Sequence, residues 1–367
     1  MSDQASSAAM PSGAPILSVL MPRAEGVVIP LAAFLAGAVA FSVFLLLVGK
    51  SPVAFFGLVW TAGFSTAFSW QNTLSQVSPL LFAALCVALP ARLGLVVIGG
   101  EGAIVLGGLA AAVAGTVVAG WPAAIGLAVM LVSAMALGGA WIATVGALRI
   151  KRGVNETIAS LLMAYIAIAL FNHLVEGPFR DPASLNKPST LPLAESLRIG
   201  DMPMISAHWG VVVGILMCVF CWVLIERTTL GFAARIAGDN LRAAQVQGLP
   251  VGRLVIGFTA LGGAFAGLAG FFEVAAVHGS ANASLIAGYG YTGILVAFLA
   301  RHNPLAIIPV AILLGGFAAS SGLIQRRMDL PDATILVFQG MIFVAILLSE
   351  AAYGRFKIFS PAYWGTR

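Results

Sequence analysis

The sequence carries very little charge. Only 9 % of its 367 residues are charged, whereas 60 % are hydrophobic, and the mean hydropathy is +1.01. A soluble domain has about 25 % charged residues, because these keep its surface hydrated. The composition therefore excludes a soluble domain and a disordered chain. Long, continuous apolar runs also exclude an outer-membrane barrel, whose strands alternate in short segments.

Cysteine is scarce as well. The three cysteines, Cys86, Cys218 and Cys221, all lie within apolar runs. The spacing of Cys218 and Cys221 is that of half a zinc or redox site, but no second pair or nearby histidine completes it. We expect these thiols to pack inside helices, and we expect no metal and no cofactor.

Signs of nucleotide or nucleic-acid chemistry are missing too. Gly49-Lys50-Ser51 ends like a phosphate-binding loop, but Phe44 stands where that loop needs glycine. The net charge of +5 is dispersed among the apolar segments, which does not favour a nucleic-acid partner. Single, scattered glutamates do not form a clustered catalytic set. We therefore expect a protein that is not an enzyme and does not hydrolyse ATP itself.

What the sequence does contain is a series of segments long enough to cross a bilayer, which takes about 20 apolar residues. The fold class predicted is an all-α, polytopic transmembrane protein of about ten spans. We interpret Pro52–Trp70, which glycine and hydroxyl residues interrupt, as an interfacial helix. The predicted spans are Val27–Val48, Val77–Leu95, Gly99–Ala119, Trp121–Leu148, Val154–Phe171, Trp209–Ile225, Leu254–Val277, Ser284–Ala300, Ala306–Ile324 and Ala333–Ser349.

The distribution of lysine and arginine orients these spans. With both termini cytoplasmic, thirteen basic residues lie inside and six outside, as the positive-inside rule requires. This topology predicts a cytoplasmic tail over residues 1–26, a transmembrane body over residues 27–350 and a second cytoplasmic tail over residues 351–367. Residues 173–208 then form a long outer loop, and residues 226–253 form an inner loop.

The inner loop contains signals for a short helix. Asp239 or Asn240 can cap a helix start by accepting free backbone N–H groups. Gly248 can adopt the left-handed backbone conformation that ends a helix, and Pro250 prevents the helix from continuing. A helix of about two turns is too short to be stable alone in water, so it needs a docking surface or support from its flanks. We interpret it as a coupling helix for a partner; the alternative is a basic loop that only fixes orientation.

The same loop carries a family resemblance. Seven of its residues are spaced as in the cytoplasmic loop of ATP-binding-cassette importer permeases of the branched-chain amino acid, sugar and nucleoside superfamily. They are Gly231, Arg235, Gly238, Asn240, Ala243, Ala244 and Gly248. Three further segments resemble signatures of the nucleoside-type permeases: Ile98-Gly99-Gly100-Glu101-Gly102, Asn155-Glu156-Thr157-Ile158 and the block from Gly288 to Ile294. Ala103, Thr157 and Ala164 depart from that pattern. Thr157 and Ala164 lie on the family's helix, so their departures bear on the substrate more than on the architecture.

The resemblance implies function and partners. It implies a permease subunit in a bacterial inner membrane that imports nucleosides or related purine compounds, together with a second, homologous permease. A separate ATPase would dock on the inner loop, and an extracytoplasmic solute-binding protein would deliver the small-molecule substrate. The ATPase-coupling residues it implies are Gly231, Arg235, Gly238, Asn240, Arg242, Ala243, Ala244 and Gly248.

Ionisable residues inside spans indicate a pathway, because a charge at the bilayer centre is costly unless it is functional or paired. Glu101 is expected to be protonated, paired with Arg92, or facing water. Glu156 is a pathway candidate or the partner of the neighbouring basic residues. Phe171 joins Tyr289 and Tyr291 as a candidate for stacking on the substrate. The pathway candidates are Glu101, Asn155, Glu156, Glu273, His278, Tyr289 and Tyr291.

Two other interpretations remain open at this point. The same architecture serves equally for a simple sugar, riboflavin or a nucleobase, since the solute-binding protein carries much of the selectivity. An ion-coupled secondary transporter would show an inverted repeat and paired broken helices, and the sequence shows no convincing repeat.

Overall fold

The computed structural model describes residues 16–203 and 207–350, and the segments 1–15 and 351–367 of the two predicted tails lie outside the described residues. The described residues form helices joined by loops, and extended pairing among them is limited to two isolated bridges, Ser189–Asn282 and Asp201–His208. The α-helices are α1 (Ile16–Leu47), α2 (Pro52–Gly63), α3 (Ala67–Ala91), α4 (Gly100–Val117), α5 (Ala123–Arg152), α6 (Glu156–Glu176), α7 (Gly210–Arg227), α8 (Thr229–Asp239), α9 (Leu241–Val246), α10 (Val251–Phe272), α11 (Tyr289–Leu299), α12 (Pro304–Met328) and α13 (Ala333–Glu350). Short turns of other helix types are η1 (Glu195–Leu197), η2 (Glu273–His278) and η3 (Ala283–Leu285).

The chain divides into two units. The first comprises residues up to 52 and from 336 onward, and the second comprises residues 53–335. In the first unit, α1 and the main part of α13 pack closely, because a Cβ on Gly37 would lie 2.7 Å from the Cα of Ile342. The rings of Phe34 and Phe41 contact Phe338 at the same interface. Helix α1 begins at Ile16, inside the stretch expected as a tail.

The second unit is built around α10, which packs against α3, α4 and α5. Small residues allow this close packing, as is usual between membrane helices. A Cβ on Gly107 would overlap the Cα of Gly267, and a Cβ on Gly267 would overlap the backbone of Ala134. Helices α4 and α5 therefore contact α10 backbone to backbone. Large apolar side chains on α5, α6 and α7 point outward instead, as expected for surfaces that face lipid.

Eight helices of the described residues are long and apolar enough to cross a membrane: α1, α3, α4, α5, α6, α7, α10 with η2, and α12. Seven of the expected spans agree with these helices to within a few residues. The second is wrong at its start: α3 begins at Ala67 rather than Val77, because Thr66 caps it and accepts from the Ser69 N–H. The predicted interfacial helix correspondingly ends at Gly63, and Trp70 belongs to α3.

The segment predicted as the eighth span is helical only over α11. Eleven residues of helix extend about 16 Å, roughly half of the hydrocarbon thickness. Nevertheless its ends lie far apart. At one end Ala281 pairs with Thr190 of the outer loop, and at the other the backbone oxygen of His302 accepts from Arg92 at the end of α3. The part of this segment that precedes α11 is therefore irregular backbone, packed within protein.

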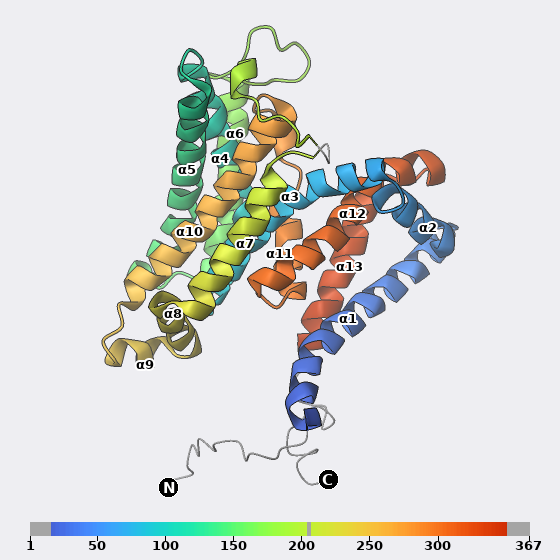
Figure 1. Cartoon of the computed structure of the whole chain (residues 1–367), viewed down its shortest axis with the longest axis vertical. Coiled ribbons are helices and arrows are strands. Elements are labelled where there is room, and N and C mark those ends of the chain that lie inside the picture. Colours follow the sequence, from blue (N-terminus) through green and yellow to red (C-terminus); the bar gives the residue numbers. More distant parts are fainter. Residues whose placement is uncertain (1–15, 204–206, 351–367) are drawn as a thin grey trace. The chain divides into compact units, whose positions relative to one another are not determined.

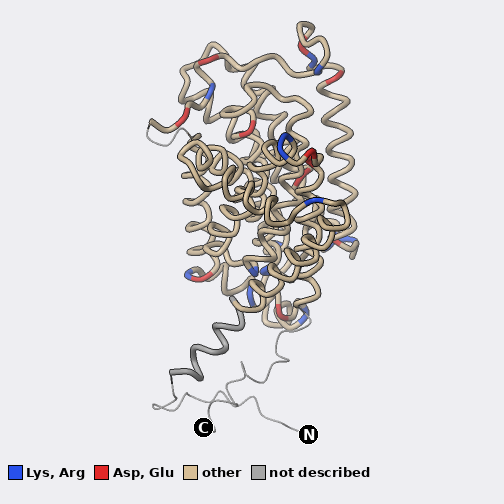
Figure 2. Tube along the Cα trace, turned by 90° about the vertical axis from the view of Figure 1, so that its right-hand side faces the viewer, with Lys and Arg blue, Asp and Glu red and all other residues tan. Residues whose placement is uncertain are grey.

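The inner loop contains two helices, α8 and α9, where the sequence predicted one. Figure 1 shows both at the end of α7 and α10 that lies opposite the segment joining α6 to α7. The inner and outer loops are thus at opposite ends of the second unit. Figure 2 shows that long stretches of the helices carry no charged residue, which fits their placement in lipid.

Candidate functional site

Glu101 lies at the start of α4 and is completely buried. Its two carboxylate oxygens accept the backbone N–H groups of Gly288 and Gly290 at 2.8 and 2.6 Å. Gly290 has to be glycine, since a Cβ there would overlap the backbone of Glu101. Of the three states expected from the sequence, pairing with Arg92 is wrong: the Arg92 guanidinium donates to the backbone oxygen of His302 instead.

Three further candidates form polar contacts beside this carboxylate. The Tyr289 hydroxyl donates to Gln76 Oε1 at 3.0 Å, joining α11 to α3. Glu273 and His278 lie at the two ends of the π-helical turn η2 and approach to 3.5 Å. Glu273 and Glu101 both interact electrostatically with Tyr289. The structure therefore gathers Glu101, Glu273, His278 and Tyr289 around the N-terminus of α11.

An exposed pair of tyrosines lies at the edge of this cluster. Tyr291 on α11 is 38 % exposed and Tyr165 on α6 is 58 % exposed, and the two side chains lie near each other. Tyr165 was absent from the predicted site; a tyrosine in the middle of an apolar helix was the available signal. Phe171 is fully buried, so the expectation that it stacks on substrate is wrong.

Asn155 and Glu156 have local partners at the start of α6. Asn155 caps the helix by accepting the N–H groups of Thr157 and Ile158 at 3.0 and 3.1 Å. Glu156 lies 3.3 Å from the Arg149 guanidinium, which is the ion pair weighed from the sequence. Both side chains therefore stabilise a helix start next to the basic end of α5.

The inner loop has the predicted caps together with an unpredicted one. Asn240 caps α9 by accepting from Arg242 and Ala243, both at 3.0 Å, and Gly248 has a φ of +81°, as a left-handed stop requires. Thr228 caps α8, the helix that sequence reasoning missed. The hydroxyl of Thr228 accepts from Gly231.

The two helices present a mixed outer surface. Phe232 is 65 % exposed and Val246 is 88 % exposed, although both lie outside the membrane spans. Arg242 and Ala243 are exposed beside them, whereas Gly231 and Ala244 are buried. Arg235 pairs with Glu226 at 2.8 Å. Exposed apolar side chains on a segment in water are typical of a protein-binding surface.

The inner face of α8 rests on the turn that follows α3. A Cβ on Gly238 would overlap the backbone oxygen of Arg92, and Gly94 adjoins the oxygen of Gly238. The Arg92 side chain reaches on to His302 at 3.1 Å, beyond the end of α11. Burial lowers the pKa of the Arg92 guanidinium, and nearby Glu226 partly offsets this. Arg92 thus joins the inner loop to α11.

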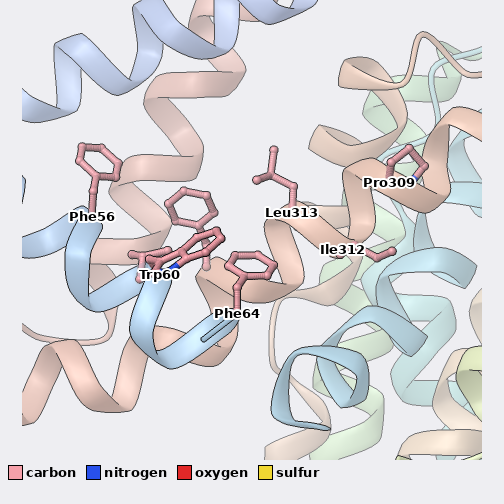
Figure 3. Close-up of a pocket in the computed structure, with 8 residues that line it drawn as sticks. Phe56, Trp60, Phe64, Pro309, Ile312 and Leu313 are labelled. Carbon is pink, nitrogen blue, oxygen red and sulfur yellow. The ribbon is translucent and has the colours of Figure 1, made fainter. Parts of the chain in front are cut away.

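A pocket of about 380 Å³ lies between α2 and α12. Figure 3 shows Phe56, Trp60 and Phe64 on one side, with Ile312 and Leu313 among the residues on the other. Its lining side chains are all apolar except for the indole N–H of Trp60. It therefore lacks the several polar partners that a sugar or nucleoside would need.

Comparisons with known proteins find transport permeases that are similar to this chain. The family model described as the permease component of the branched-chain amino acid transport system matches residues 69–347. The chain is 31 % identical to the guanosine ABC transporter permease protein NupP of Bacillus subtilis, over 87 % of this chain and 94 % of that protein. It is 30 % identical to the glucose ABC transporter permease protein TsgB13 of Haloferax volcanii, over 94 % of this chain and 89 % of that protein. It is 23 % identical to the nucleoside ABC transporter permease protein NupB of Lactococcus lactis, over 79 % of this chain and 82 % of that protein.

Proposed function

The chain belongs to the family of branched-chain amino acid transport system permease components, and on that premise we propose that it imports nucleosides or related purine compounds. It is a multi-pass membrane protein and a transport component, and we infer that a separate subunit hydrolyses the ATP. The observation that carries the proposal is the similarity to a guanosine permease over 94 % of that protein's length. Glucose is the cargo named for a relative of nearly equal identity, so a simple sugar is the second candidate, with riboflavin or a nucleobase behind it.

The proposed pathway runs past the N-terminus of α11. Polar groups from four elements converge there: Gln76, Glu101, Glu273 and Tyr289. The exposed rings of Tyr165 and Tyr291 offer flat, amphipathic surfaces on which a purine can stack, with hydroxyls for hydrogen bonds. Asn155, Glu156 and His278 remain pathway candidates; the first two act near the inner end, where Arg149 neutralises the carboxylate.

The proposed complex has four kinds of component. A separate ATPase docks on α8 and α9, whose exposed Phe232 and Val246 need a partner surface. A second, homologous permease completes the pathway, and a solute-binding protein delivers cargo to the outer loop in a bacterial inner membrane. Ten crossings with cytoplasmic termini are part of this proposal. One of these crossings is supported by the segment from Ala281 to His302, whose ends contact Thr190 of the outer loop and Arg92 in the turn after α3.

The test is uptake by the full complex in proteoliposomes. Labelled guanosine should accumulate when the solute-binding protein is outside and ATP is inside, and an ionophore that collapses ion gradients should not prevent it. Unlabelled glucose, riboflavin and adenine serve as competitors. Uptake of glucose with no uptake of guanosine would establish the sugar alternative, and uptake that follows the ion gradient without ATP would contradict an ATP-driven importer.

Variants of the two tyrosines connect the cargo to the site. Tyr165→Leu and Tyr291→Leu should each lower guanosine uptake about fivefold or more, since an aromatic contact contributes about 1 kcal/mol or more. Ile166→Leu is the matched control, because Ile166 is similarly exposed on another side of α6. Equal uptake by both tyrosine variants and the control would exclude the stacking role.

A further inference from the structure

The feature that the proposed pathway leaves unexplained is the choice of partner for Glu101. A buried carboxylate in a membrane protein is expected to pair with a cation or face water. Glu101 does neither, because both of its oxygens accept backbone N–H groups from the start of α11. Those N–H groups belong to a helix that begins in the interior of the second unit, beside the Cα atoms of α4.

The first turn of a helix has N–H groups without intrahelical partners and carries a partial positive charge of about +0.5. For α11 these groups cannot turn to water, since Gly290 is buried against Gly100 and Glu101. Broken helices in transporters commonly direct such N-termini at an anionic group of the substrate. Here Glu101 already occupies that position, with bonds as short as those of charge-assisted pairs.

We propose that Glu101 is a positioning residue, an internal anion that occupies the N-terminus of α11 and holds this half-length helix against α4. Because its carboxylate uses these donors, α11 offers none to an anionic cargo, and the pathway suits uncharged compounds. This inference deepens the proposed function and rests on the transporter role, but not on the identity of the cargo.

The position of α11 matters because the helix is fixed at both ends. Its start is held by Glu101, and the turn after it is held by Arg92, which also supports α8. Helix α11 is therefore a rigid connection between the inner loop and the interior cluster. Loss of the anion should free the start of α11 while its other end stays attached.

The experiment removes the anion and then returns it. Glu101→Ala deletes the CH2–COO⁻ group, which acetate can replace. Two measurements are made on the full complex in proteoliposomes: uptake of labelled guanosine, and the rate at which N-ethylmaleimide alkylates Ala287→Cys in a background with Cys86, Cys218 and Cys221 changed to alanine. Ala287 is exposed next to Gly288, so its alkylation reports the start of α11. Sodium gluconate, too large for the vacated space, controls for ionic strength.

We expect Glu101→Ala to lower uptake about tenfold or more, since two charge-assisted bonds are lost, and to raise the alkylation rate by a similar factor. Acetate, but not gluconate, should restore both values, and neither salt should change the wild type. If Glu101→Ala fails to reach the membrane, Glu101→Asp and Glu101→Gln decide: the aspartate should retain uptake and the amide should lose it.

Two results would overturn the inference. One is wild-type behaviour of Glu101→Gln in both measurements, because the charge would then be dispensable. The other is a Glu101→Ala protein that is well inserted, defective and unaffected by acetate. If the wild type takes up no guanosine, the proposed cargo is wrong, but the alkylation rate needs no cargo and still tests the anion.

Discussion

Three glutamates in the apolar body are each stabilised by a different partner. Glu101 uses backbone N–H groups, Glu156 uses the Arg149 guanidinium, and Glu273 uses His278. Glu156 lies at a helix start near other basic residues, where an ion pair costs little. Glu101 and Glu273 lie in protein interior, so their partners have to come from the fold itself. The residue type alone therefore does not define a role in transport.

His302 gives a prediction about pH. Burial, reinforced by the positive charges of Arg92 and Arg301, lowers its pKa from 6.5 to about 4. The folded protein then keeps this imidazole neutral where the unfolded chain protonates it. Since stability rises with pH wherever the unfolded state binds more protons, the contribution of His302 is complete above pH 6.5 and is lost as the pH falls toward 4. The loss is on the order of 3 kcal/mol.

The measurement compares thermal melting of the purified protein from pH 7 to about 4.5 with that of His302→Asn. Asparagine does not titrate and tolerates the positive φ of 53° at this position. The melting temperature of the variant should fall less steeply on acidification. Parallel curves would mean that His302 titrates at its ordinary pKa.

Residue-level prediction from sequence succeeded where the interaction is local. The sequence offered Asp239 or Asn240 as the helix cap and Gly248 as the helix end, and the structure has Asn240 as the cap, because such signals depend only on neighbouring residues. The partners of Glu101 are almost 190 residues away, and nothing in the spacing of the chain selects Gly288 and Gly290 over Arg92. Exposure likewise depends on the fold, which is why Tyr165 was missed and Phe171 was wrongly included.

Among the elements, the long helices were predictable and the short ones were not. Hydropathy over about 20 residues locates α4, α5 and α10 because burial in lipid dominates their stability. Helix α8 has only 11 residues, and its position depends on the contact of Gly238 with the turn after α3. Helix α11 is shorter than its apolar segment, since the preceding residues pair with the outer loop instead.

The contact beneath α8 predicts the effect of Gly238→Leu. Any Cβ there overlaps the backbone oxygen of Arg92, and neither backbone can move without shifting a helix end. The side chain should therefore lift α8 from its support and disconnect the inner loop from α11. We expect stimulation of ATP hydrolysis by loaded solute-binding protein to fall about fivefold or more, with membrane abundance near that of the wild type.

Gly257→Leu is the control for this prediction. Gly257 is exposed on α10 and has nothing within 4 Å of an added Cβ, so leucine there should be tolerated. Normal stimulation in Gly238→Leu would show that the loop transmits ATP hydrolysis without this contact.

At the scale of the whole molecule, composition and hydropathy were sufficient for the class of fold. Both the all-helical architecture and the placement of most spans follow from one physical requirement, that backbone groups in lipid be bonded within a helix. The number of crossings is harder, because α11 and α13 fall short of the length that identifies a span. The number then depends on where the ends of each segment lie rather than on its hydropathy.

The last prediction tests that topology directly. Leu185 in the outer loop is 82 % exposed, and Ala243 in the inner loop is exposed on α9. The two loops lie at opposite ends of the second unit, and basic residues favour the side of Ala243 by thirteen to six. In a background without the native cysteines, Leu185→Cys should react with a membrane-impermeant maleimide added to intact spheroplasts. Ala243→Cys should react only after the membrane is opened. Labelling of Ala243→Cys from outside, or protection of Leu185→Cys, would reverse the orientation and remove the inner loop from the side on which ATP is hydrolysed.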